Sequence, residues 1–194
     1  MLPPTKRGPP KTDYSLMEME TSRLSLRPVQ PDDLLHIHRG LSHPEVIPYY
    51  AVSYETLEET EREQMTWFAE LREKNTGIWW VIFEKTSNHF VGAGGFNDWH
   101  HEHRKAEIGF WLLPEYWGRG YMTEAMQALF RYGFDTMDLH RIEGYVESGN
   151  RKSRRAVEKT GFAHEGTMRE CEWKEGRFIS VEVYAFLSSD FDIG

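Results

Sequence analysis

The chain has 194 residues, a formal net charge of −8 and 39% hydrophobic residues, which suits one globular domain and excludes a disordered chain. Its acidic balance argues against general nucleic-acid binding, because phosphates would be repelled, and it suits a cationic partner such as an amine. The single cysteine, Cys171, excludes an internal disulfide and a multi-thiolate metal site.

The first part of the chain is expected to contain an arm, a strand and two helices. Residues 1–18 are proline-rich and predict a flexible N-terminal arm before a single domain, residues 19–194. Residues 23–27 alternate polar and apolar side chains, as a half-buried strand does. A helix is expected to begin at 30–33, where a proline and two acids stand in the first turn, and a longer polar helix covers 53–74.

The middle of the chain predicts three antiparallel strands. Residues 79–83 and 90–96 are apolar and flank a short polar turn, which indicates a hairpin. Residues 105–113 form the third strand, in which Ala106 and Ile108 share one face and Glu107 lies on the other.

The last part of the chain alternates helices and strands. A helix is expected over 121–135, a strand over 141–146, and a short helix over 150–160 that Gly161 ends. Two further strands are expected near 162–170 and 178–187. This order predicts an α/β (α+β) fold with a mixed, mostly antiparallel sheet and helices on both faces. No span of about 20 apolar residues and no signal peptide are evident, so a cytoplasmic location is expected.

Two glycines, Gly118 and Gly120, stand where the third strand turns into the next helix. A helix N-terminus has unpaired N–H groups and a partial positive charge, and glycines allow an anion to approach them, so this turn is a candidate pyrophosphate site. A tight turn that needs positive φ is the alternative. A P-loop is excluded because Tyr121 follows Gly120, and a dinucleotide fingerprint is disfavoured because Thr123 replaces its third glycine.

Two segments together resemble a known family. The stretch 117–121, Trp-Gly-Arg-Gly-Tyr, is similar to the acetyl-CoA loop of the GNAT superfamily of N-acetyltransferases. The stretch 150–166 is similar to the matching segment of its ribosomal-protein N-acetyltransferase branch, as is the strand 104–111. The resemblance covers roughly residues 20–188. One departure is Glu115, which stands where the family signature has Arg or Gln.

The resemblance implies a sheet that splays apart beside the loop, with acetyl-CoA lying in the opening. Leu112 and Leu113 would then offer backbone groups to the pantetheine, and Asn150 and Ser153 would bind it near the thioester. The run 151–155 adds four cations near the coenzyme phosphates or, alternatively, a solvated helix face. The residues implied for the pyrophosphate are Trp117, Gly118, Arg119, Gly120, Tyr121, Met122 and Thr123.

Acetyl transfer to an amine needs a neutral nucleophile, and a general base helps to produce it. Glu107 is the first candidate for the base, Glu143 and Glu170 are lesser ones, and a strand carboxylate paired to a cation is the alternative interpretation of Glu107. The helix 150–160 has no tyrosine to act as the acid, and the ribosomal-protein branch suggests Ser153 instead. A backbone N–H near Leu112 could stabilise the thioester oxyanion.

Other residues attract attention without carrying a site. The run 100–103, His-His-Glu-His, is expected to be an exposed loop and not a metal site, because consecutive residues rarely converge on one ion. Four tryptophans, Trp79, Trp80, Trp99 and Trp111, are expected in the core, although they could line an acceptor cleft bordered by Phe96, Asn97 and Trp99. Cys171 is expected to be a small packing residue.

The sequence therefore predicts an acetyl-CoA-dependent N-acetyltransferase that acts on a primary amine. A protein N-terminus, such as that of a ribosomal protein, is the favoured acceptor on family likeness. A small amine, either a polyamine or an antibiotic, is the second candidate, and a non-catalytic acyl-CoA-binding module is the alternative from another class. We expect a monomer or homodimer with no metal, no membrane and no direct nucleic-acid partner.

Overall fold

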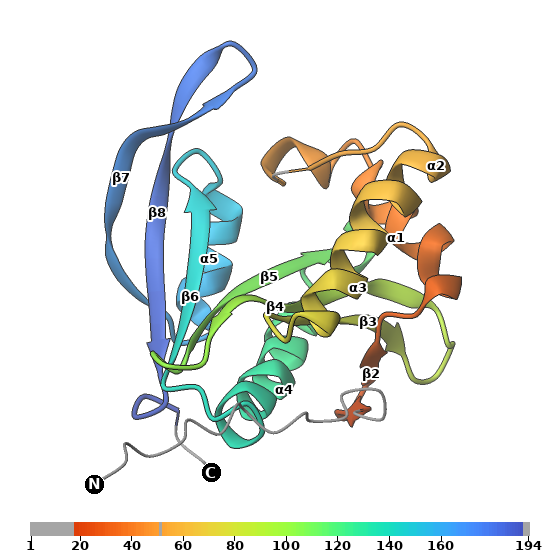
Figure 1. The fold of residues 1–194 in the computed structure, drawn as a ribbon, viewed down its shortest axis with the longest axis horizontal. Coiled ribbons are helices and arrows are strands. Elements are labelled where there is room, and N and C mark those ends of the chain that lie inside the picture. The colour runs from red at the N-terminus through yellow and green to blue at the C-terminus, as the bar shows by residue number, and fades with distance from the viewer. Residues whose placement is uncertain (1–17, 51, 192–194) are drawn as a thin grey trace, which may run out of the picture.

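The computed structural model describes residues 18–50 and 52–191, so the predicted arm, residues 1–18, lies outside it apart from Glu18. Within these residues one eight-stranded sheet forms the centre, in the order β1-β2-β3-β4-β5-β6-β8-β7, and β5 and β6 are its only parallel pair (Figure 1). Its strands are β1 (Met19–Glu20), β2 (Leu24–Pro28), β3 (Ile78–Glu84), β4 (Phe90–His100), β5 (Lys105–Leu112), β6 (Arg141–Glu147), β7 (Ala163–Lys174) and β8 (Arg177–Leu187). The predicted mixed, mostly antiparallel sheet is confirmed.

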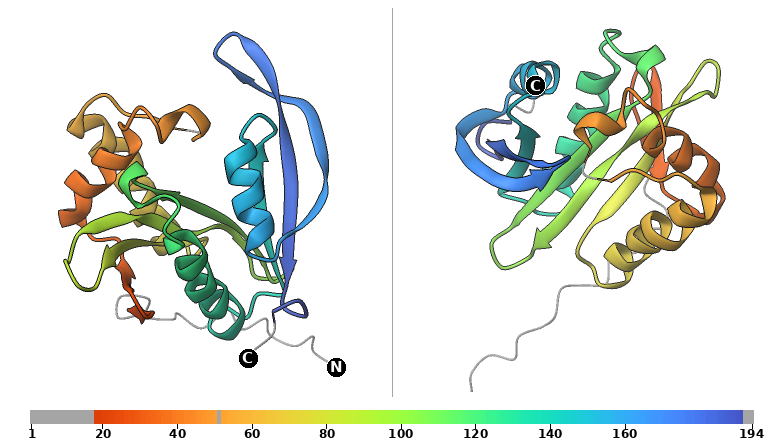
Figure 2. Two further views of the ribbon diagram at one scale, coloured as in Figure 1. Left: turned by 180° about the vertical axis from the view of Figure 1, so that it is seen from behind. Right: turned by 90° about the horizontal axis from the view of Figure 1, so that it is seen from above.

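The described residues contain five α-helices, and short 3-10 turns precede some of them. The helices are α1 (Leu34–Leu41), α2 (Leu57–Glu59), α3 (Thr66–Glu73), α4 (Tyr121–Asp135) and α5 (Arg151–Lys159). The first three cover one face of the sheet, and α4 and α5 lie on the other (Figure 2). On the first face Phe68 of α3 packs on Trp79, and on the second Leu129 of α4 reaches the β4 backbone at Gly94. Helices therefore cover both faces, as the element order predicts.

The sheet opens between its two parallel strands. β5 pairs with β6 only over Lys105–Glu107 against Arg141–Glu143, although both strands continue for several residues. Beyond that point β6 rises away from β5 together with β7 and β8 (Figure 1). We call this opening the V; it has its closed end at Glu107 and its mouth at the end of β5.

Several local predictions need correction. The helix expected from residue 53 begins at Leu57, because Thr56 and Glu59 form a reciprocal capping box, and it continues through a π-helical segment, Thr60–Met65, into α3. Cys171 is exposed on edge strand β7 and is not a packing residue, because little covers this strand on either face. Phe96 is fully buried on the α4 side, so it does not border an acceptor cleft.

Within the described residues, the structure contains no helix with both the length and the hydrophobicity needed to cross a membrane.

Candidate functional site

The open edge of β5 begins with the backbone of Leu112. Gly92 and Leu112 face each other across β4 and β5, and the Leu113 N–H donates to the Val91 carbonyl at 2.9 Å. Because alternate residues of a strand direct their backbone groups to opposite edges, the Leu112 N–H and C=O face the V. The Leu112 carbonyl accepts a hydrogen bond from Trp117 Nε1 at 2.8 Å.

Leu113 is placed differently from its neighbour. Its N–H is bonded to β4, and its carbonyl accepts from the Tyr116 N–H at 3.0 Å. Its side chain is fully buried. The expectation that Leu113 offers backbone groups to a ligand therefore finds no support in this geometry, whereas Leu112 presents its backbone to the V.

The turn that follows β5 leaves backbone donors exposed. Gly118 and Gly120 have φ values of +73° and +78°, in the left-handed region that favours glycine. Gly120 is the N-cap of α4, and no side chain caps the helix. The N–H groups of Tyr121, Met122 and Thr123 then have no partner in the preceding turn. The turn presents donors and a helix-dipole charge of the sign that an anion needs.

The turn is held from behind by Arg23 and Glu124. The Arg23 guanidinium donates to the Arg119 carbonyl at 2.9 Å and to Glu124 at 2.6 Å. Glu124 also accepts from Thr21, Ser22 and the Arg23 N–H. Burial alone would raise the pKa of this carboxyl, but the hydrogen bonds outweigh burial and hold its pKa at about 2. A side chain that is charged at neutral pH thus holds the start of α4.

The Tyr121 side chain is buried, and its hydroxyl donates to Glu84, so only its backbone is available to a ligand. Glu115, the departure from the family signature, is exposed and pairs with Arg39 at 2.6 Å. Its carboxylate is therefore turned toward α1, and the backbone donors of the turn do not depend on it.

On the other side of the V, Asn150 begins α5. Its side-chain oxygen accepts from the Ser153 N–H at 3.0 Å, which makes Asn150 the N-cap of the helix. The Ser153 hydroxyl belongs to the first turn and is half-buried. Arg154, one of the four predicted cations, binds Glu182 and Tyr184 instead of facing a ligand site. The other three cations of the run 151–155, Arg151, Lys152 and Arg155, are exposed.

Glu107 lies at the closed end of the V and is half-buried. Burial raises the pKa of its carboxyl, a hydrogen bond from Asn97 lowers it, and the nearby charges of Asp98, Glu143 and Glu172 raise it further. The net direction is upward, as suits a group that must accept a proton near neutral pH.

Glu143 is next to Glu107 in the register of the sheet but has a different environment. Burial would raise the pKa of its carboxyl, but hydrogen bonds from Arg141 and Lys105, at 2.8 and 3.0 Å, lower it. This carboxylate is already neutralised and suits a structural role. Glu170 lies on exposed edge strand β7, and it is Glu172 whose charge acts on Glu107.

The floor beside Glu107 is a tryptophan ring over two glycines. A Cβ at Gly95 would lie 2.6 Å from the Trp79 side chain, and one at Gly109 would lie 2.5 Å from the same indole. Only glycine therefore allows this ring to lie flat against β4 and β5. Trp79, Trp80, Trp99 and Trp111 are buried, as expected. Burial raises the pKa of the Tyr50 phenol, and the charge of Glu107 raises it further. Tyr50 therefore lies near the closed end of the V.

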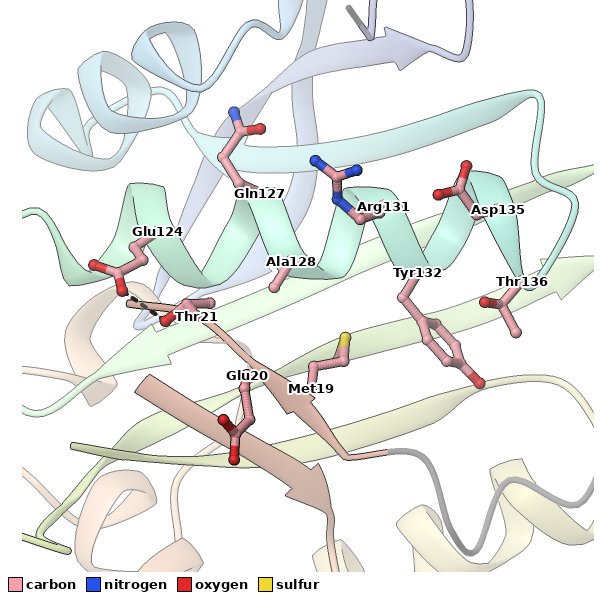
Figure 3. Close-up of a pocket in the computed structure, with 10 residues that line it drawn as sticks. All are labelled: Met19, Glu20, Thr21, Glu124, Gln127, Ala128, Arg131, Tyr132, Asp135 and Thr136. Atoms are coloured by element: carbon pink, nitrogen blue, oxygen red, sulfur yellow. Dashed lines mark hydrogen bonds between the residues drawn. The ribbon is translucent and has the colours of Figure 1, made fainter. Parts of the chain in front are cut away.

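A surface groove of about 610 Å³ lies elsewhere, between β1 and the side of α4 (Figure 3). Met19, Ala128 and Tyr132 line it, and the Glu124 carboxylate stands at one end. It follows the flank of α4 and not its N-terminus, and its carboxylate would repel a phosphate. Its lining has side-chain donors such as Arg131, but it offers no helix N-terminus with free backbone N–H groups.

The histidine run does not gather metal ligands. His101 packs on Trp99 and bonds to Asn75, whereas His100 and His103 are exposed. In the part of the chain that the structure describes, no group of three or more His, Cys, Asp or Glu residues could hold a metal ion.

Comparison with known proteins gives a consistent result. The family described as "Acetyltransferase (GNAT) domain" matches residues 23–163. The chain is 33% identical over 171 residues to the uncharacterized N-acetyltransferase YoaA of Bacillus subtilis, covering 87% of this chain and 96% of that one.

Two solved structures share the fold over most of their length. Spermidine N-acetyltransferase from Vibrio cholerae, in complex with CoA and spermine, superposes with a TM-score of 0.78 at 25% identity, covering 88% of this chain and 98% of that one. The ribosomal L7/L12 α-N-protein acetyltransferase RimL, in complex with coenzyme A, gives a TM-score of 0.78 at 22% identity with the same coverage, 88% and 98%. The second similarity, at its lower identity, shows the fold alone.

Proposed function

The chain belongs to the GNAT family of acetyltransferases, and from that premise we propose that it acetylates the N-terminal α-amine of a protein. N-acetyltransferase activity and the use of acetyl-CoA as co-substrate follow from the family. The observation that carries the assignment of the site is the junction of β5 and α4. There an uncapped helix N-terminus and two left-handed glycines lie beside the open edge of a strand.

The donors and charges of the junction fit acetyl-CoA. The N–H groups of residues 118–123 are the proposed ligands of the pyrophosphate, while the Trp117 N–H is already bonded to the Pro114 carbonyl. The Leu112 backbone supports pairing with the pantetheine along the V. The exposed Arg151, Lys152 and Arg155 can attract the remaining phosphate charge.

Glu107 is the proposed general base. The neutral amine attacks the thioester carbonyl carbon, its proton passes to the Glu107 carboxylate directly or through a water, and the carbon–sulfur bond then breaks. A β5 backbone N–H that faces the V is the proposed donor to the carbonyl oxygen. The Ser153 hydroxyl, at the start of α5, is the proposed donor to the departing sulfur.

The charges of β5 and β6 beside Glu107 favour an acceptor amine with a single positive charge. Lys105 and Arg141 neutralise Glu143, and Lys174 neutralises Glu147, so much of the acidic lining is already paired. An α-amine has a pKa near 8, and its deprotonation at pH 7 costs about 1 kcal/mol, against about 4–5 kcal/mol for a lysine-like amine. A single carboxylate base therefore suits an N-terminal amine.

A polyamine acceptor is the second candidate. The charges of Asp98 and Glu172 act on Glu107 and would attract a second ammonium group. The similarity to a spermidine acetyltransferase, at 25% identity, also supports this class. We rank it second because several of the other carboxylates already have cationic partners.

An acceptor screen tests the proposal. Purified protein with acetyl-CoA is assayed for thiol release against N-terminal peptides that begin with Ala, Ser or Thr, against the same peptides with a blocked N-terminus, and against spermidine and spermine. The proposal predicts turnover that depends on a free peptide N-terminus. Faster turnover with spermidine than with every peptide would overturn it in favour of the second candidate, and CoA binding without turnover would indicate a binding module.

A further inference from the structure

The Trp117 side chain lies at the mouth of the V and is 39% exposed. Its indole N–H donates to the Leu112 carbonyl at 2.8 Å. On the other side, Lys152 Nζ of α5 lies 5.8 Å from the ring centroid. The indole thus stands between the end of β5 and the start of α5, which are the two walls of the proposed pantetheine site.

The hydrogen bond of Trp117 uses an acceptor that the coenzyme needs. Leu112 is the last residue of β5, and its backbone faces the V because its neighbour Leu113 bonds to β4. An amide N–H of pantetheine that pairs with this edge requires the same carbonyl. In this conformation the indole N–H holds that position.

The backbone around Trp117 allows its side chain to leave. The Trp117 N–H is fixed to the Pro114 carbonyl at 3.0 Å, so the residue keeps its place when the side chain rotates. The next residue, Gly118, is exposed, and a Cβ built there meets nothing within 4 Å. The polar contacts of the indole are one neutral hydrogen bond and one exposed cation–π contact, and both are weak interactions in water.

We propose that Trp117 is a side-chain gate: its indole N–H occupies the Leu112 carbonyl in the free protein and is displaced when acetyl-CoA binds. The inference rests on the proposed coenzyme site in the V. Closing the gate lowers the apparent affinity for the coenzyme, because only the open fraction of molecules can bind. A single hydrogen bond of this kind corresponds to a factor of about 2 to 12 in that affinity.

Trp117→Phe tests the gate because it keeps an aromatic ring and removes the N–H donor. The matched control is Trp173→Phe, since Trp173 is 65% exposed on the β7–β8 hairpin. Calorimetry with CoA should show the Trp117→Phe protein binding at least 2-fold more tightly than wild type, with the control unchanged. Equal or weaker binding by Trp117→Phe would overturn the gate, and weaker binding would make Trp117 a direct contact of the coenzyme.

A second measurement reports on the hydrogen bond itself. The seven tryptophans give indole N–H signals in a ¹⁵N-edited spectrum, and the signal of Trp117 is the one missing in Trp117→Phe. Saturating CoA should shift this signal and speed its exchange with water, whereas the Trp173 signal stays in place. A Trp117 signal that does not move in CoA-saturated protein contradicts the gate. If wild type binds no CoA at all, the coenzyme site itself fails, which is a different result.

Discussion

Replacement of Glu107 with glutamine tests the proposed chemistry most sharply. The substitution keeps the size of the side chain and leaves an amide that can still bond to Asn97. It removes the group that accepts the proton of the amine. Loss of a positioned general base lowers the rate by about 10²- to 10⁴-fold, which corresponds to about 3–5 kcal/mol in the activation barrier.

The same assignment also predicts how kcat/KM depends on pH. Burial and three neighbouring carboxylates raise the pKa of Glu107 above its ordinary value of 4.5. Below the raised pKa the carboxyl is protonated and cannot act as a base, so kcat/KM should fall as the pH decreases through it. The acidic limb of the wild-type profile should therefore lie above pH 4.5 and should be absent from Glu107→Gln.

Glu143→Gln is the matched control, because the two residues are neighbours in the β5–β6 register. Removing this negative charge should lower the pKa of Glu107 and move the acidic limb to lower pH, while kcat/KM at pH 8 stays within about 10-fold of wild type. The assay is thiol release over a pH series, with CoA affinity measured by calorimetry. A Glu107→Gln enzyme that keeps more than a third of wild-type kcat/KM would refute the base assignment.

Three further predictions concern the supports of the site. Glu124→Gln should destabilise the fold by about 3 kcal/mol at pH 7, because the folded pKa is about 2 against 4.5 and each pKa unit is worth about 1.4 kcal/mol. In wild type this stability is present above pH 4.5 and is lost as the pH falls toward 2. Urea unfolding of wild type and Glu124→Gln over a pH series measures the loss of stability and its pH dependence. A loss below 1 kcal/mol at pH 7 would contradict the prediction. Ser153→Ala should lower kcat by about 10-fold or more. The affinity for CoA should stay nearly unchanged, because the helix cap uses the backbone N–H of Ser153 and not its hydroxyl. An unchanged kcat would show that Ser153 takes no part in the chemistry. Gly109→Ala places a Cβ 2.5 Å from the Trp79 ring and should cost about 1–3 kcal/mol in the same unfolding assay, whereas a neutral effect would show that the ring moves freely.

The sequence predicts the elements well where the pattern is local. The helix over 121–135 is confirmed at both ends, because an apolar stripe begins directly after glycine. Residues 79–83 and 90–96 do form the expected hairpin. The long helix is displaced at its start because the capping box at Thr56 outweighs the helical propensity of the preceding residues.

Properties that depend on long-range packing are less accessible from the sequence. The face of Phe96, the exposure of Cys171 and the side-chain contacts of Arg154 depend on neighbours far along the chain. Glu172 is also missed as a neighbour of Glu107, because the strand is expected to end near residue 170, whereas β7 continues to Lys174 after a register shift between Met168 and Glu172. No sequence signal in β7 marks that bulge.

The central claim is that backbone N–H groups of residues 118–123 hold the diphosphate of the coenzyme. The most direct measurement is a ¹⁵N amide spectrum of the protein titrated with CoA and, separately, with pantetheine, which lacks the diphosphate. The account predicts that CoA gives its largest amide shifts at residues 118–123 and that pantetheine leaves these signals nearly unmoved. Largest shifts along the β1–α4 groove, or equal shifts at 118–123 with both compounds, would contradict it.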